Sequence, residues 1–112
     1  MKLKLINAVS LHSVVSQLNV SCLKDNAEKL SLIRLAVALK HYAQQWDDTR
    51  QTAQNMAAKE ATTLLNQEAA SEVEIDDNLL VSIESAETLA VANSETLPAG
   101  ALSYIIDYLT KD

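Results

Sequence analysis

The stretch that decides the fold is residues 21–70, SCLKDNAEKLSLIRLAVALKHYAQQWDDTRQTAQNMAAKEATTLLNQEAA. It contains neither glycine nor proline, the two residues that most often interrupt a helix. Leucines recur along it at helical spacing, as at Leu32, Leu35 and Leu39. The pattern predicts one long α-helical segment, and Ser21 is the residue that we expect to cap its start.

The apolar face of this predicted helix changes width along its length. In the first half it is widened by further apolar residues, which predicts packing against more than one neighbour: Leu23, Ala27, Leu30, Ile33 and Val37. Beyond Trp46 it narrows to Ala53, Met56, Ala57 and Leu64. A straight helix to Ala70 would be about 75 Å long, whereas a compact domain of this size has a radius of gyration of about 13 Å. We therefore expect either a break within residues 47–62 that folds the helix back as a hairpin, or a protruding helix covered by a partner.

The residues before the long helix predict two short elements. Lys2-Leu3-Lys4-Leu5 alternates between polar and apolar side chains, which indicates a short strand. Apolar residues at helical spacing then predict an amphipathic helix over 8–18, with Asn7 as its N-cap.

The residues after the long helix predict a small sheet and a closing helix. The strict alternation of Glu72-Val73-Glu74-Ile75-Asp76 predicts a strand with its two apolar side chains inward. Residues 79–83 and 89–92 are interpreted as further extended segments, with a short helical turn between them. Pro98 fits the first turn of a final helix. The buried face of that helix is predicted at Leu102, Ile105, Ile106 and Leu109.

These elements predict an α+β fold that is predominantly helical. It has three helices, the central one long, and a small sheet that is mostly C-terminal. We expect a single domain over residues 1–112, in which 1–70 form a helical part and 71–112 a small acidic part that contains strands.

Composition excludes several classes of protein. Apolar residues make up 48% and charged residues 21% of the 112, which is typical of a globular chain rather than a disordered one. Cys22 is the only cysteine, so an internal disulfide is excluded. No apolar run approaches the roughly 20 residues that span a bilayer. Polar residues follow the Met1–Ile6 segment closely, so we do not expect a signal peptide or secretion.

The net charge of −6 is unevenly distributed along the chain. Residues 1–59 carry eight Lys/Arg and four Asp/Glu, a balance of +4, whereas residues 60–112 carry one Lys and eleven Asp/Glu, a balance of −10. The acidic part would repel nucleic acid and acidic membranes, and we expect neither as a partner. The split would allow copies of the chain to pair head to tail, or it would simply keep the protein soluble.

The sequence carries no pattern typical of a catalytic, cofactor or metal site. His12, Cys22 and His41 lack the spacing of zinc ligands. The pairs Asp47-Asp48 and Asp76-Asp77 lack a third carboxylate at a fixed spacing. Gly100 is the only glycine, which excludes a glycine-rich phosphate-binding loop. We therefore expect no cofactor, no metal and no enzyme activity.

Four aromatic residues are the best candidates for contact with a protein partner. Tyr42 and Trp46 lie four residues apart on the long helix, and Tyr104 and Tyr108 lie four apart on the last one. Aromatic side chains are enriched both in protein cores and at interface centres, so both roles remain open at this point.

The order of these pieces resembles a family of short bacteriophage proteins of unknown function. The shared layout is a long helix, then the strand Glu72-Val73-Glu74-Ile75-Asp76, then Leu97-Pro98-Ala99-Gly100-Ala101-Leu102 at the start of a terminal helix. One departure is the Ala/Thr/Gln-rich segment Ala57–Ala70, where the family would have more charged residues. The resemblance implies a phage or prophage origin and assigns no activity or site residue.

Together these observations predict a non-enzymatic interaction or structural protein of phage or prophage origin. It would act through protein–protein contacts in virion assembly, with copies of itself or with a phage or host protein. Its location would be the host cytoplasm or the virion. The alternative is a small acidic effector that binds and inhibits a host protein by imitating nucleic-acid charge through residues 60–112.

Overall fold

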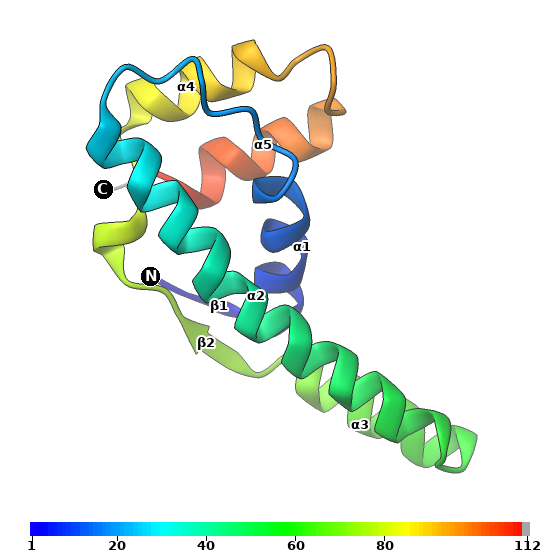
Figure 1. Cartoon of the computed structure of the whole chain (residues 1–112). Helices are drawn as coiled ribbons and strands as arrows, with labels where there is room; N and C mark the ends of the chain where they lie inside the picture. Colours follow the sequence, from blue (N-terminus) through cyan, green and yellow to red (C-terminus); the bar gives the residue numbers. More distant parts are fainter. Residues whose placement is uncertain (111–112) are drawn as a thin grey trace.

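The computed structural model describes residues 1–110 as a predominantly helical α+β fold with a long central helix (Figure 1). The elements in chain order are β1 (Lys2–Lys4), α1 (Leu5–Val15), α2 (Asn26–Gln54), α3 (Ala58–Ala69), β2 (Glu72–Glu74), the 3₁₀ turn η1 (Asp77–Leu79), α4 (Ile83–Ala92) and α5 (Ala99–Tyr108). The predicted fold class is confirmed. The described part of the chain contains five α-helices, however, where the sequence predicted three.

The predicted break in the long helix is confirmed. Helix α2 ends at Gln54, a turn follows, and α3 starts at Ala58 and runs back along α2 as a hairpin (Figure 1). The hairpin also protrudes: the Cα radius of gyration is 15.4 Å and the extents are 50 × 28 × 19 Å. Helix α3 has no buried residue, because small and polar side chains dominate this part of the chain.

One hydrophobic core holds the rest together, and both predicted parts of the chain contribute to it. Helices α1 and α2 pack against each other, and α5 packs against both α1 and α4. Leucine, isoleucine and valine fill most of the core. Its largest fully buried apolar side chains are Leu5, Leu11, Leu32, Leu35, Leu39, Ile75, Val81, Leu89, Ile105 and Leu109.

The sheet has two strands and joins the start of the chain to the segment that follows the hairpin. Strands β1 and β2 are antiparallel, with Leu3 opposite Val73. The pairing extends beyond the strands, because the Leu5 amide donates to the Ser71 carbonyl at 2.8 Å. The predicted strand at 72–76 therefore exists as β2, but half of the sheet is N-terminal rather than mostly C-terminal.

Of the two extended segments predicted at 79–83 and 89–92, the second is wrong. The first is confirmed only at residues 80–82, where the backbone of Leu80 and Ser82 is extended. Residues 77–79 form η1 and residues 83–92 form α4. The Ser82 side chain accepts a hydrogen bond from the Ser85 amide, which caps α4 and starts a helix where valine and isoleucine suggested a strand. Val81 keeps one extended contact, a parallel bridge to Thr110.

Two predicted helix starts also differ from the structure. Helix α1 begins at Leu5, directly after β1, and ends at Val15, rather than running over 8–18 from a cap at Asn7. Helix α2 begins at Asn26, because the Asp25 side chain accepts from the Ala27 amide and caps it. Ser21 therefore lies in the loop before α2.

Helix α5 closes the fold as predicted. Pro98 immediately precedes its first residue, Ala99. Ile105 is fully buried, and Leu109, just past the helix end, is buried as well. Leu102 and Ile106 are half-buried and pack against the same core.

Asn93 is the one fully buried polar side chain in the part of the chain that the structure describes, and it fastens the loop before α2 to the end of α4. Its Oδ1 accepts from the Asn19 amide at 2.9 Å, and its Nδ2 donates to the Asn19 carbonyl at 3.2 Å and to the Leu89 carbonyl at 2.8 Å. These bonds satisfy two backbone groups of a loop that has no regular structure of its own.

We expect Asn93→Ala to lower the free energy of unfolding by about 1–3 kcal/mol, because the Asn19 amide and carbonyl would lose their buried partner. Urea denaturation followed by circular dichroism measures the change. Asn66→Ala is the matched control, since Asn66 is exposed on α3. Equal unfolding free energies for the two variants would show that the Asn93 bonds do not hold the loop.

Candidate functional site

The packing of α2 against the core leaves apolar residues on its opposite side. Leu32, Leu35 and Leu39 are buried. Because a helix turns about 100° per residue, residues at 30, 33 and 37 then point away from the core. Leu30 is 44%, Ile33 57% and Val37 67% exposed. We call these three residues the α2 stripe.

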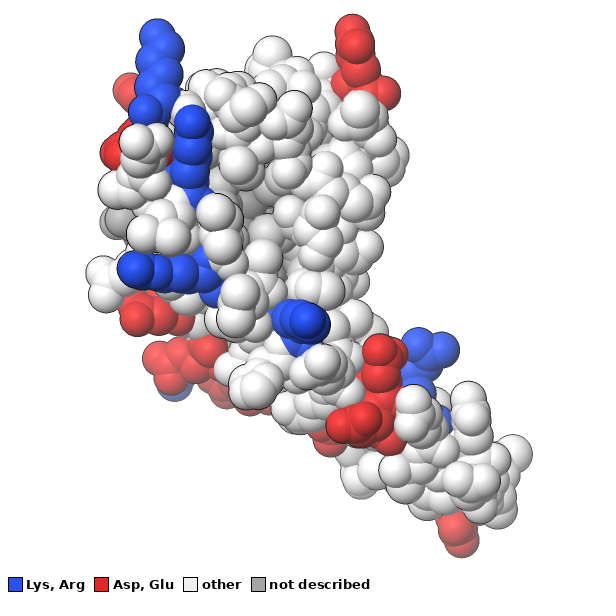
Figure 2. All heavy atoms as spheres, in the orientation of Figure 1, with Lys and Arg blue, Asp and Glu red and all other residues white. Residues whose placement is uncertain are grey.

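A groove lies beside the α2 stripe, between α2 and the end of α1. Its volume is about 300 Å³, and apart from Ser16 its wall is apolar. Ile33, Val37, Ala36, Val15, Leu18 and Val20 contribute to that wall. The viewed face in Figure 2 is hollowed at this place, next to α2. The stripe and the groove form one continuous apolar surface, of the kind that marks an interaction site.

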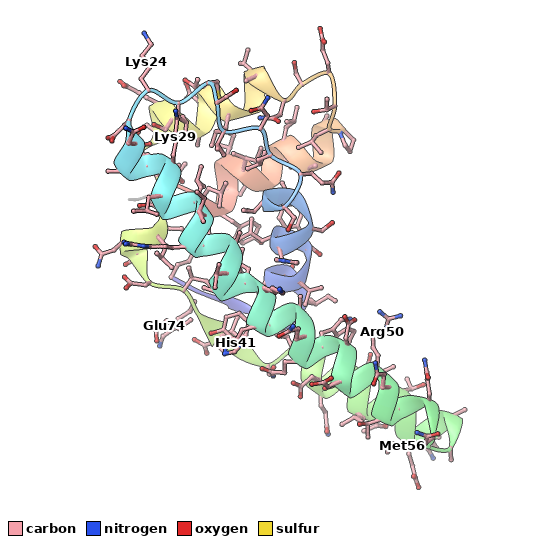
Figure 3. The ribbon with its side chains drawn as sticks, viewed as in Figure 1. Lys24, Lys29, His41, Arg50, Met56 and Glu74 are labelled. Carbon is pink, nitrogen blue, oxygen red and sulfur yellow. The ribbon has the colours of Figure 1, made fainter. Side chains whose placement is uncertain are left out.

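From Lys29 onward, the charged residues along the α2 stripe are all basic, while Glu28 lies on the opposite side of the first turn. Lys29, Arg34 and Lys40 lie on this part of α2, and residues 29–46 contain no acidic side chain. The blue spheres in Figure 2 follow α2 down the viewed face. Figure 3 shows Lys24 and Lys29 at the N-terminal end of α2. Within residues 1–110, none of these cations is in an ion pair. Their charge is therefore free to attract an acidic partner.

Helix α4 carries a second exposed surface of opposite charge. Ile83 is 48% and Val91 75% exposed, and Glu84 and Glu87 are exposed on the same helix. We call these four residues the α4 face. A shallow hollow lies over it, lined in part by Glu84, Glu87 and Val91. Residues 60–110 contain no lysine or arginine, so no positive charge on this part of the chain offsets the α4 face.

The structure places the four aromatic candidates in two groups, and neither lies on the α2 stripe. Tyr42 and Trp46 are half-buried and pack against the core. The Tyr42 hydroxyl donates to the Glu74 carbonyl at 3.1 Å, which ties α2 to β2. Tyr104 and Tyr108 stack on each other on α5, with ring centroids 5.1 Å apart. Their role as partner contacts stays a prediction, and Tyr42 also has a structural one.

The residues that could carry chemistry are scattered. In the described part of the chain, no group of three His, Cys, Asp or Glu side chains is placed to hold a metal ion. His12 lies 3.3 Å from the Ser16 hydroxyl on the exposed side of α1. Cys22 lies in the loop before α2, whereas His41 lies well along that helix.

Three of the four paired carboxylates make contacts within the fold. Asp47 lies 3.5 Å from Arg50 in an exposed ion pair. Asp76 caps η1 by accepting from the Asn78 amide, and Asp77 contacts the Met1 amino group at 2.7 Å.

None of the helices in residues 1–110 combines the length and apolarity needed to cross a bilayer.

Sequence reasoning found the apolar residues of the α2 stripe and predicted that they pack against a second neighbour, but it did not say whether that neighbour belongs to the same chain. Only one side of the wide apolar face is covered, so the other side is available for contact. The α4 face was missed, because residues 83 and 91 were assigned to strands. The signal that could have found it is Ser82 followed by Glu84 and a run of good helix formers.

Comparison with known proteins gives no family assignment: no family model, no curated protein and no solved structure matches this chain. The resemblance to short phage proteins therefore stays a prediction.

Two substitutions, two residues apart, test which side of α2 faces the core. We expect Leu35→Ala to lower the unfolding free energy by about 2–5 kcal/mol, because it leaves a cavity in the core. Val37→Ala should change it by less than about 0.5 kcal/mol, because the side chain is largely in solvent. Thermal or urea unfolding measures both. Similar losses for both variants would contradict the exposure of the α2 stripe.

Proposed function

We propose that this protein is a non-enzymatic interaction protein of phage or prophage origin, which acts through protein–protein contacts as a structural or assembly component. The observation that carries this proposal is the α2 stripe with its adjoining groove. Leu30, Ile33 and Val37 are exposed together in a chain whose other leucines are all buried or half-buried. An uncovered apolar surface rimmed by cations is typical of a docking site for another protein.

Two other classes of partner fit this surface less well. A nucleic acid would meet three apolar side chains between the cations, and no aromatic residue lies among them to stack on bases. A membrane-binding helix usually presents a longer apolar face with Trp or Phe, which the α2 stripe lacks. A protein surface with apolar and acidic side chains matches both the stripe and its rim.

The origin rests on the resemblance, and two of the segments that carry it form regular structure. Residues 72–74 form β2, and Leu97-Pro98 precedes α5 directly. We place the protein in the host cytoplasm or in the virion, and not among secreted proteins.

The alternative, an acidic inhibitor of a host protein, would depend on an unpaired row of carboxylates. The residues best placed for it are Glu72, Glu74, Asp76 and Asp77, all of them exposed. Glu72 lies 3.7 Å from Lys2, and Asp77 contacts the Met1 amino group. Because the fold partly offsets this row, the apolar surface on α2 supports the first proposal better.

A photo-crosslinking amino acid at position 37 tests the proposed function in cells of the organism that carries the gene. We expect one specific protein adduct, because Val37 is the most exposed residue of the α2 stripe. Gln67, exposed on α3, is the matched control position and should give no such adduct. Adding Ile33→Asp should abolish the adduct at position 37. Adducts with lipid or nucleic acid alone, or equal adducts at both positions, would overturn the proposal.

The genomic neighbourhood of the gene tests the proposed origin separately. We expect head or tail genes of a phage or prophage beside it, because structural genes of such viruses are clustered. A neighbourhood of host metabolic genes would overturn the phage origin, while the interaction function would stand on the crosslinking result.

A further inference from the structure

The two exposed apolar surfaces of this chain carry opposite charges. The α2 stripe is surrounded by Lys29, Arg34 and Lys40, whereas the α4 face carries Glu84 and Glu87 between Ile83 and Val91. Within residues 1–110, neither glutamate is in an ion pair, and neither are the three cations. Each surface therefore has apolar residues to cover and charges to neutralise.

We propose that the occupant of the α2 stripe is the α4 face of a second copy of this chain. This inference rests on the proposed function and names its partner. Leu30, Ile33 and Val37 of one copy would pack against Ile83 and Val91 of the next, with the cations of α2 around the glutamates of α4. Both halves of the contact are present on every copy, so no other component is required.

Charge selects this pairing among the three that two such surfaces allow. Two α2 stripes brought together would place cations against cations, and two α4 faces would place carboxylates against carboxylates. Like charges facing each other across an interface are disfavoured, so the mixed pairing is the only one of the three that charge favours.

The two surfaces also match in length. From Lys29 to Lys40 the axis of α2 advances about 17 Å, and the ten residues of α4 extend about 15 Å. One helix can therefore lie along the other over the whole length of α4, with Glu84 and Glu87 near one end of the contact. Because the two surfaces differ, the contact is heterologous. Two copies form a closed pair when each engages both of its surfaces with the other. Otherwise the copies assemble into a ring or an open chain.

Charge reversal on each surface tests this pairing. We expect the wild-type protein to gain mass with concentration up to about 500 µM, measured by sedimentation velocity, and to lose this association in about 1 M salt. Arg34→Glu with Lys40→Glu should weaken self-association at least about tenfold, and so should Glu84→Lys with Glu87→Lys, because each places like charges in contact. The matched control is Arg50→Glu with Lys59→Glu, which makes the same charge change on the hairpin and should leave the association unchanged.

Mixing the two reversed proteins provides the decisive arm. Each still carries one unaltered surface, so the unaltered α4 face of one fits the unaltered α2 stripe of the other. We expect the mixture to regain the mass that neither protein shows alone. Circular dichroism melting curves confirm that each variant is folded before it is used.

Several results would overturn the pairing. These are a wild-type protein that stays monomeric, association unaffected by either reversal, and a mixture that does not recover. Binding of the monomer to phosphatidylserine vesicles, lost with Arg34→Glu and Lys40→Glu, would assign the α2 stripe to a membrane instead. A crosslink from position 37 to a different protein, with a monomeric wild type, would overturn self-pairing and leave the proposed function standing. Absence of both crosslink and self-association would overturn the two together.

Discussion

The structure depends on the rotational setting of α2 about its own axis. Leu32, Leu35 and Leu39 are fully or almost fully buried in the core that α1 and α2 share, and this burial fixes which side of the helix faces inward. Once that side is fixed, helical periodicity leaves Ile33 and Val37 in solvent. The same packing that stabilises the fold therefore creates the exposed apolar surface.

The far end of α2 follows a different physical rule. Beyond Trp46 its side chains are too small and polar to bury much area, so this part contributes little to a core. The chain turns back at residues 55–57, and α3 packs along the end of α2. The two helices of the hairpin therefore contact mainly each other, and the hairpin lies outside the main body. Two long-range connections then return the chain to the body. Strand β2 pairs with β1, and the Tyr42 hydroxyl bonds to the Glu74 carbonyl.

Periodicity predicted the parts of the fold that have a long or strict pattern. The core leucines of α2, the break within 47–62, the strand around Val73 and the closing helix with Ile105 could all be derived from spacing. Element boundaries and short apolar runs could not, because they depend on capping bonds. Asp25, with Glu28 three residues later, is a recognisable helix start that outcompeted Ser21.

The candidate surface was harder to predict for a related reason. A wide apolar face on a helix indicates two neighbours, but the sequence does not say whether the second belongs to the same chain. In this fold, α1 and the segments around it cover one side of α2, while α4 packs on α5 instead. Because residues 83 and 91 were assigned to strands, their common face with two glutamates did not emerge from the sequence.

The fold also redistributes the charge asymmetry of the chain. The basic first half and acidic second half do not become two opposite ends, because β1 and β2 lie side by side and place Lys2 and Lys4 opposite Glu74 and Glu72. Charge is thus offset within the sheet, where the two halves meet. It remains unbalanced on the solvent side of α2 and on α4, the helices whose exposed apolar residues are also uncovered. Exposed apolar residues and unbalanced charge coincide on both surfaces. A contact between the two surfaces would bury the apolar residues and neutralise the opposite charges at the same time.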